Sequence, residues 1–253
     1  MHPPAHALRR YGTAATDLDV AFGACPDDVQ ATEVLARCSG ADAASVQGWT
    51  LPRRLQALLA VCCGSHADGS ETCTPATLAC PACAARFEIE LPLARCRQPV
   101  DDTPLPLRTA AGTPLLVRLP TGDDLLAWRG LPAPDEAALA AHLLLEVDGR
   151  APAAGFVPGP ELVAAVADAL AARDPCTVLP VQAACPECGH TQEADIDLQA
   201  LLLRDLAAQQ RRLLAEITAL ARAFHWSEAQ ILALPAWRRA HYLASLESAG
   251  ALA

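Results

Sequence analysis

The chain has 253 residues, of which 52% are hydrophobic, so it can form one or two domains with a real core and is not a disordered protein. Aromatic residues make up only 4%, and much of the apolar content is Ala and Leu, which favours helices because these side chains lose little entropy in a helix. The formal net charge of −10 disfavours a general nucleic-acid binder, which needs a basic surface.

No apolar run reaches the roughly 18 residues that a membrane span needs. The N-terminal segment Met1-His2-Pro3-Pro4 lacks the charged and apolar regions of a signal peptide, so we expect a cytoplasmic protein. The eleven cysteines are an odd number in a chain without a signal, which disfavours a disulfide framework and favours metal ligation for some of them.

The N-terminal region, residues 1–73, is predicted to be helical. One helix is expected over Ala31–Cys38. A second is expected to begin after Thr50 as its cap, with Pro52 in its first turn and a run of leucines facing inward. Residues 64–75 are rich in small polar side chains, which predicts a loop.

Residues 97–175 are predicted to form an inserted, mostly helical segment that also contains strand. Residues 97–113 are Pro-rich and are expected to be irregular, whereas Pro114–Leu119 can form a strand. Three helices are expected: one capped by Thr121 with acidic groups near its positive end, one over Glu136–Val147, and one from Pro160 that stops before Asp174-Pro175.

The C-terminal region, residues 199–253, is predicted to consist of amphipathic helices. Leu203, Leu213 and Leu220 belong to a stripe of apolar residues at helical spacing, which ends at Phe224. Ser227 and Gln230 then form a capping box, with Trp226 positioned to staple against Ile231, and Pro235 begins a last helix. Four side chains are candidate partner-binding residues, with ordinary core packing as the alternative: Trp226, Trp237, Tyr242 and Leu246.

Two Cys-Pro-x-Cys turns carry the strongest chemical signal in the sequence. Cys80 and Cys83 form the first pair, Cys185 and Cys188 the second, and each pair can turn two sulfurs towards one point. Polar residues recur at matching positions after each pair, and alternating apolar residues lie between them, which is typical of half-buried strands. We therefore predict two similar turn-plus-strand units, residues 74–96 and 176–198, that face each other as a split zinc ribbon.

The predicted fold class is α+β, mainly α, with the ribbon between helical N- and C-terminal parts. A structural Zn²⁺ held by four thiolates leaves no open coordination position, which argues for a scaffold and against catalysis. Metal-free thiols and a redox pair remain as alternatives. His190 could replace a cysteine ligand, be an exposed turn residue, or donate a hydrogen bond to a ligand sulfur. No role is predicted for the other cysteines. A second metal site is an alternative to ordinary thiols for those near the first pair in sequence: Cys62, Cys63, Cys73 and Cys96. The rest are expected to be core or surface thiols: Cys25, Cys38 and Cys176.

The order of motifs resembles a known family. The C-terminal segment is similar to the end of baseplate or baseplate hub assembly proteins. These proteins come from contractile-tailed phages of the T-even type and from related phage-tail-like injection systems. The similar residues run from Phe224-His225-Trp226-Ser227 to Leu234-Pro235 and continue with Trp237-Arg238-Arg239. Further matching segments precede it in the expected order: Leu51–Val61, Cys80–Cys83, Val117–Leu125 and Cys185–Gly189. The resemblance covers about residues 15–248. Ala84 departs from the glycine that commonly follows such turns, so we expect strain there.

The resemblance implies a non-enzymatic role in building or completing a contractile-tail baseplate. The implied partners are other baseplate or tail proteins, with no nucleic acid, membrane or small-molecule substrate. The implied location is the cytoplasm of a bacterial host or the tail particle itself. A zinc-ribbon nucleic-acid-binding regulator is the alternative, and a zinc or thiol enzyme is a third hypothesis. The acidic residues after both cysteine pairs disfavour the regulator.

Overall fold

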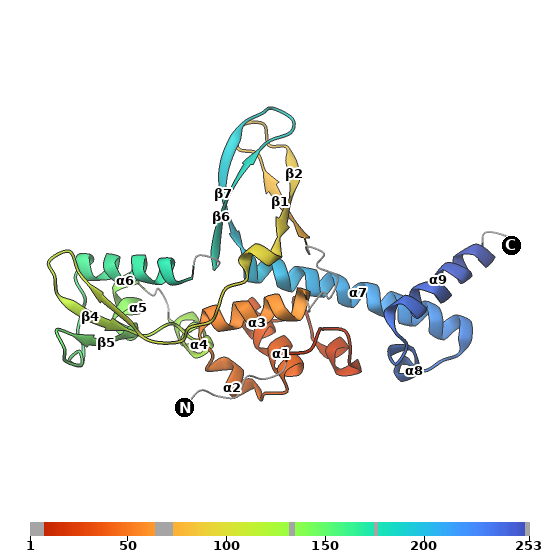
Figure 1. Ribbon diagram of the computed structural model, residues 1–253, viewed down its shortest axis with the longest axis horizontal. Coiled ribbons are helices and arrows are strands. Elements are labelled where there is room, and N and C mark those ends of the chain that lie inside the picture. Colours follow the sequence, from red (N-terminus) through yellow and green to blue (C-terminus); the bar gives the residue numbers. More distant parts are fainter. Residues whose placement is uncertain (1–7, 64–72, 132–134, 175–176, 251–253) are drawn as a thin grey trace.

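The computed structural model describes residues 8–63, 73–131, 135–174 and 177–250, and it is a mixed structure with 51% helix and 19% strand. Figure 1 shows a helical body from which three parts extend. Two hairpins rise from the body as a pillar, the inserted segment lies on one side, and a C-terminal arm lies on the other. In the described residues, no helix is both long and apolar enough to cross a membrane.

The helical body combines the N-terminal helices with the first half of the longest helix. Its elements are the 3₁₀ helix η1 (Ala15–Asp19), α1 (Asp27–Ser39), α2 (Ala43–Gln47), α3 (Leu51–Cys63) and α7 (Leu198–Phe224). Leu35, Leu58 and Leu202 are fully buried where α1, α3 and α7 pack together. The helical prediction for this region is confirmed.

Local sequence explains where these helices begin. The helix expected over Ala31–Cys38 begins four residues earlier, because Asp27 and Asp28 fit the positive end of α1 and its first turn follows Pro26. Helix α3 begins at Leu51, and the Thr50 hydroxyl accepts the backbone N–H of Arg53 at 3.4 Å, as predicted for its cap.

The inserted segment has its own small core. Strands β3 (Leu105–Arg108), β4 (Pro114–Val117) and β5 (Leu144–Val147) form an antiparallel sheet in that order. Helices α4 (Gly122–Arg129), α5 (Glu136–Leu143) and α6 (Pro160–Arg173) accompany it, and α5 and α6 contribute to a cluster with buried Leu115 and Val117. Two predictions were wrong. Residues 97–113 contain β3, and the helix expected to reach Val147 ends at Leu143, because the next four residues pair with β4.

Asp124 ties the inserted segment together at the start of α4. Its buried carboxylate accepts two hydrogen bonds from Arg118, at 2.6 and 2.7 Å, and others from the N–H and hydroxyl of Thr121. Desolvation raises the pKa of Asp124, but the Arg118 guanidinium outweighs that effect and holds it well below its usual range. His142 lies 3.0 Å from the same carboxylate. The Thr121 capping box is therefore confirmed and is part of a larger network.

A close backbone approach joins the inserted segment to the body. The N–H of Leu51 donates to the carbonyl of Pro120 at 2.8 Å. A Cβ on Gly122 would lie 2.8 Å from the carbonyl oxygen of Gln47, so only glycine fits here. Beside it, the fully buried guanidinium of Arg54 donates to the carbonyl of Asp28 and the hydroxyl of Thr32, and its burial lowers its pKa to about 10.

The C-terminal arm consists of the second half of α7 with α8 (Glu228–Leu232) and α9 (Ala236–Gly250). Leu213, Ile217, Leu220 and Ile231 form its buried centre. The predicted capping box of Ser227 and Gln230 is confirmed. Helix α7 ends at Phe224, and His225, which caps it, adopts a left-handed conformation with φ 56°. The amphipathic helices expected over residues 199–253 are therefore present.

Candidate metal centre

The pillar consists of two hairpins with the same register. The first pairs β1 (Cys73–Ala79) with β2 (Arg86–Pro92), and the second pairs β6 (Val178–Ala184) with β7 (Thr191–Asp197). Ala79 pairs with Arg86 at the end of the first, and Ala184 pairs with Thr191 at the same place in the second. Each hairpin thus carries its Cys-Pro-x-Cys turn at the tip, far from the body (Figure 1).

Each hairpin repeat contains a strand before its cysteine turn, and for the first hairpin this strand was not predicted. The loop expected over residues 64–75 lies partly outside the described residues, but its end belongs to β1, which begins at Cys73. Thr74, Ala76 and Leu78 are buried while their neighbours are exposed, so the alternation was present in the sequence. The strand expected over Val178–Val181 also continues to Ala184.

The same hydrogen bonds shape both turns. The N–H of Cys80 donates to the carbonyl of Ala85, and the N–H of Cys185 donates to the carbonyl of His190, both at 2.9 Å. Ala84 has φ 60° and its counterpart Gly189 has φ 73°. This left-handed conformation suits glycine and strains alanine, so the expected strain at Ala84 is confirmed.

The two turns bring four sulfurs together from positions more than 100 residues apart. The Sγ atoms of Cys80 and Cys188 lie 3.6 Å apart, those of Cys83 and Cys185 lie 3.7 Å apart, and all four lie within 4.8 Å of one another. A tetrahedral site with metal–sulfur bonds of about 2.3 Å requires sulfur–sulfur distances of roughly 3.8 Å. These two sulfur–sulfur distances meet this requirement, and they are far too long for disulfides, whose S–S bonds are about 2.05 Å.

The cluster combines buried and exposed sulfurs. Cys80 and Cys185 are each 2% exposed, whereas Cys83 and Cys188 face solvent. Burial raises the pKa of Cys80, but the N–H groups of Cys83 and Ala82 outweigh this effect and lower it to about 7. The N–H of Ala85 lowers the pKa of Cys83, whereas the neighbouring sulfurs raise it, with a net value of about 12. Four thiolates so close together therefore need a cation, and the cluster could hold one metal ion.

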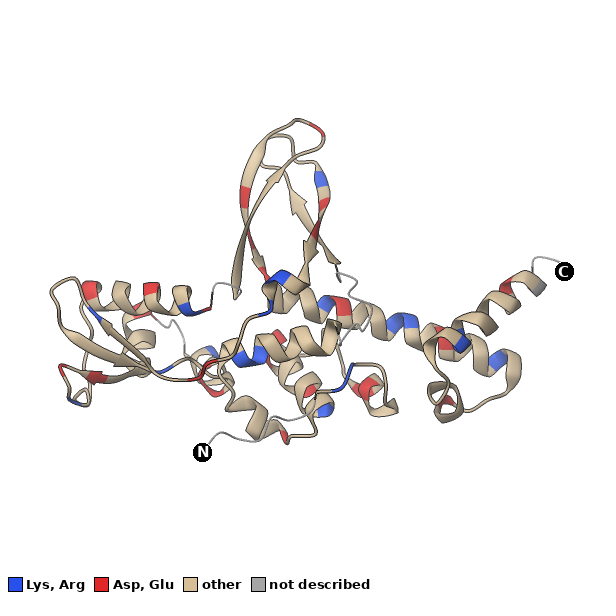
Figure 2. Cartoon of the chain, viewed as in Figure 1, with Lys and Arg blue, Asp and Glu red and all other residues tan. Residues whose placement is uncertain are grey.

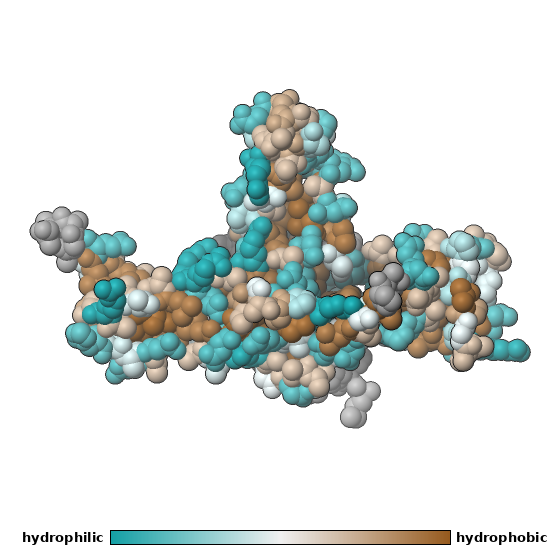
Figure 3. Space-filling view, turned by 180° about the vertical axis from the view of Figure 1, so that it is seen from behind, coloured by the Kyte–Doolittle hydropathy of each residue, from teal (hydrophilic) through white to brown (hydrophobic). Residues whose placement is uncertain are grey.

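The two hairpins are also held together by apolar side chains below the cysteines. Phe87 and Leu91 of β2 and Ile196 of β7 are buried in the core that continues into the body. From behind, hydrophobic residues of the pillar lie between hydrophilic ones (Figure 3). Gln192 occupies the position that corresponds to Phe87, and its side chain donates to the carbonyl of Ala79 at 3.3 Å, across the two hairpins.

The other described cysteines do not join the centre. Cys38, Cys63 and Cys96 are buried, Cys25 and Cys62 are half-buried, and Cys73 is exposed at the start of β1. Burial raises the pKa of Cys38 to about 11, which makes its thiol unreactive at neutral pH. Cys176 lies outside the described residues. His190 is exposed and is absent from the four-sulfur group, the one candidate metal group that the described residues contain.

The four candidate partner-binding residues occupy two kinds of environment. Trp226, Tyr242 and Leu246 are half-buried against the centre of the arm, and Trp226 also stacks on Phe224 with ring centroids 4.8 Å apart. Trp237 is different because it is 71% exposed. Partner binding at these residues stays a prediction.

No family model matches the chain, and no similar curated protein or solved structure was found.

Proposed function

We propose that this protein is a non-enzymatic assembly factor or minor structural component of a contractile phage-tail or tail-like baseplate, and that a structural zinc ion stabilises it. The observation that carries the proposal is the meeting of Cys80, Cys83, Cys185 and Cys188 at the tip of the pillar. Each hairpin has too few strands to be stable alone, so a shared metal ion would hold the two in one unit, as a split zinc ribbon.

Zinc is the metal that this donor set favours. Four thiolates in tetrahedral arrangement are typical of structural zinc, and paired Cys-x-x-Cys turns are a common way to supply them. The metal would clamp residues near 80 to residues near 185, which closes a loop of about 100 residues. Loop closure of that length costs several kcal/mol of chain entropy by the logarithmic rule, and metal–thiolate binding offsets that cost.

A closed site of this kind supports a scaffold rather than an enzyme. With all four positions filled by cysteine, the metal would have no place for a water molecule or a substrate. Outside the cluster, burial raises the pKa of the buried thiols Cys38 and Cys63, which is the opposite of what a nucleophile needs. Both features favour a protein whose work is done by binding.

The baseplate assignment rests on the order of motifs in the sequence. The Val117–Leu125 segment supports it structurally, because it joins the inserted segment to the body through Pro120, Gly122 and Asp124. The Phe224–Trp226 segment forms the bend between α7 and α8. These two matching motifs thus lie at joints between the parts, which fits a protein that presents several surfaces in a fixed arrangement.

The nucleic-acid-binding alternative has less support. Glu88 and Glu90 project from the first hairpin, and the second carries Glu187, Glu193, Asp195 and Asp197 without any Arg or Lys. Figure 2 shows these acidic positions along the pillar. A polyanion would be repelled by this surface.

The assembly role is tested by binding to neighbouring tail proteins. Purified protein is mixed with tube, sheath and hub proteins of a contractile tail, at low and high salt, and complexes are detected by size-exclusion chromatography. We expect at least one stable complex, weakened in the Trp237→Ala variant if the arm takes part. Recovery of no complex at either salt concentration contradicts the proposed role.

A further inference from the structure

An apolar cleft lies where the body, the inserted segment and the second hairpin meet. It consists of two adjoining hollows of about 220 Å³ and about 410 Å³, both lined by Leu51, Thr177 and Val178. The two hollows adjoin at these residues, and together they are called the cleft. No segment of the chain described by the structure fills it.

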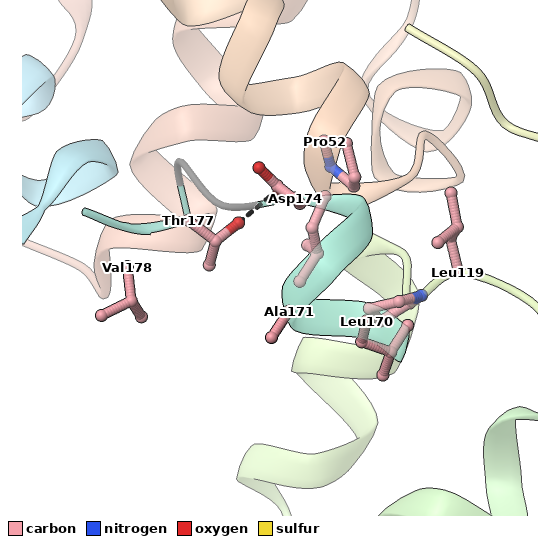
Figure 4. A pocket seen from close by; sticks show the side chains of 9 residues that line it. Pro52, Leu119, Leu170, Ala171, Asp174, Thr177 and Val178 are labelled. Atoms are coloured by element: carbon pink, nitrogen blue, oxygen red, sulfur yellow. Dashed lines mark hydrogen bonds between the residues drawn. The ribbon is translucent and has the colours of Figure 1, made fainter. Parts of the chain in front are cut away.

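Aliphatic side chains dominate its walls. Figure 4 shows Leu119, Leu170 and Val178 around the smaller hollow. In the larger hollow, Leu55 and Leu125 form the apolar wall. Val178 is 54% exposed, so the cleft presents apolar surface to water. A ligand that covered it would remove this apolar surface from water.

Two carboxylates also line the larger hollow. Asp195 and Asp197 are exposed on the outer face of β7, directly beside Val178, which pairs with Asp197. Asp174 lies on the wall of the smaller hollow. Among the described residues that line either hollow there is no Arg, Lys or His. The cleft is therefore apolar inside and negative at its edge.

We propose that this cleft binds a segment of a partner protein in which a few aliphatic side chains are followed by Arg or Lys. The aliphatic side chains would cover Leu51, Val178 and Leu170, and the basic residues would pair with Asp195 and Asp197. The acidic edge excludes nucleic acid and anionic lipid as occupants. This proposal specifies the chemistry of the partner segment. It rests on the proposed assembly role only for the statement that the segment comes from a tail protein.

A set of labelled peptides tests the proposal directly. The probe is a fluorescein-labelled decapeptide with leucines followed by arginines. One control peptide has glutamates in place of the arginines, and another has serines in place of the leucines. Binding to the full chain is measured by fluorescence anisotropy at low and high salt. We expect the leucine–arginine peptide to bind most tightly and to weaken as salt rises.

Two matched variants locate the binding site. Val178→Asp should weaken binding of the leucine–arginine peptide about tenfold, because it places a charge against the aliphatic side chains. Val157→Asp is the control, since Val157 is 77% exposed and does not line the cleft, and it should bind as the parent protein does. Asp195→Asn should reduce both the affinity and the salt dependence. Circular dichroism checks that all three variants are folded.

The proposal is overturned if Val178→Asp binds the peptide as tightly as Val157→Asp, or if the glutamate peptide binds as well as the arginine peptide. Self-association that Val178→Asp abolishes would assign the cleft to a second copy of this chain and would also overturn it. A protein that holds metal and binds tail proteins but not the peptide would overturn the cleft proposal alone. Peptide binding without any tail complex would overturn only the assembly role.

Discussion

The two hairpins of the pillar have the same backbone plan but different surfaces. Both have seven-residue strands, the same register, the same turn hydrogen bonds and an inward-facing cysteine that is 2% exposed. On the outside, Arg86 of the first corresponds to Thr191 of the second, and Pro92 corresponds to Asp197. The shared features are those that position sulfur atoms, whereas the differences lie on surfaces that a partner could contact.

Because the two hairpins share a backbone plan, we expect equivalent cysteines to contribute equally to the stability of the protein. Cys80→Ser and Cys185→Ser should each lower the free energy of unfolding by at least about 3 kcal/mol, because each removes one buried thiolate and with it the metal. Urea unfolding followed by circular dichroism measures this effect. Cys25→Ser, at a half-buried cysteine outside the cluster, is the matched control and should change stability by less than about 0.5 kcal/mol. A large loss for only one of the two cluster variants would break the equivalence.

The inward-facing residues that follow the two turns should contribute differently to stability. Phe87→Ala should cost about 3 kcal/mol, because it leaves a cavity between the hairpins. Gln192→Ala, at the corresponding position, should cost less than about 1 kcal/mol, since its bond to Ala79 is long and its Oε1 is buried without a hydrogen-bond partner. Thermal unfolding of both variants checks this. Equal losses would mean that apolar packing between the hairpins is not centred on Phe87.

The glycine after the second turn should resist substitution. Gly189→Ala should destabilise the protein by about 1 kcal/mol through backbone strain. An added Cβ there would meet no atom within 4 Å, so a steric clash does not contribute. The measurement is again the urea midpoint, and Gly149→Ala is a useful second case because that glycine has φ 72° and equal space. A Gly189→Ala variant as stable as the parent would show that the turn relaxes.

The reverse change in the first turn should give the smallest effect. Ala84→Gly relieves the strain at φ 60° but also makes the unfolded chain more flexible, so we expect a gain of no more than about 0.5 kcal/mol. Differential scanning calorimetry of the metal-loaded protein can resolve such a shift. A clear loss of stability would mean that the Ala84 methyl group makes contacts that outweigh its strain.

The sequence predicted the parts of this fold that depend on local signals. Thr121 and Ser227 were recognised as caps because their side chains act on backbone groups within the same turn. The cysteine pairs were recognised because their spacing itself determines where the sulfurs point. The four sulfurs do meet, although more than 100 residues separate the pairs.

The missed elements depend on partners distant in the sequence. Leu144–Val147 continues the apolar pattern of α5 and becomes strand only because β4 offers it a pairing edge. Leu105–Arg108 contains a proline and is short, so it lacked a strand signal and is found at the edge of its sheet. The cleft beside Val178 was also missed, since it is built from three segments whose proximity no local pattern reveals.

Metal content is the most direct test of the proposed zinc site. The protein is purified without added metal, and its zinc and sulfur contents are measured by inductively coupled plasma mass spectrometry. We expect one zinc ion per chain, lost in Cys185→Ser and retained in Cys25→Ser. A folded protein that contains no metal, with all four cluster thiols free to react with a thiol reagent, would contradict it.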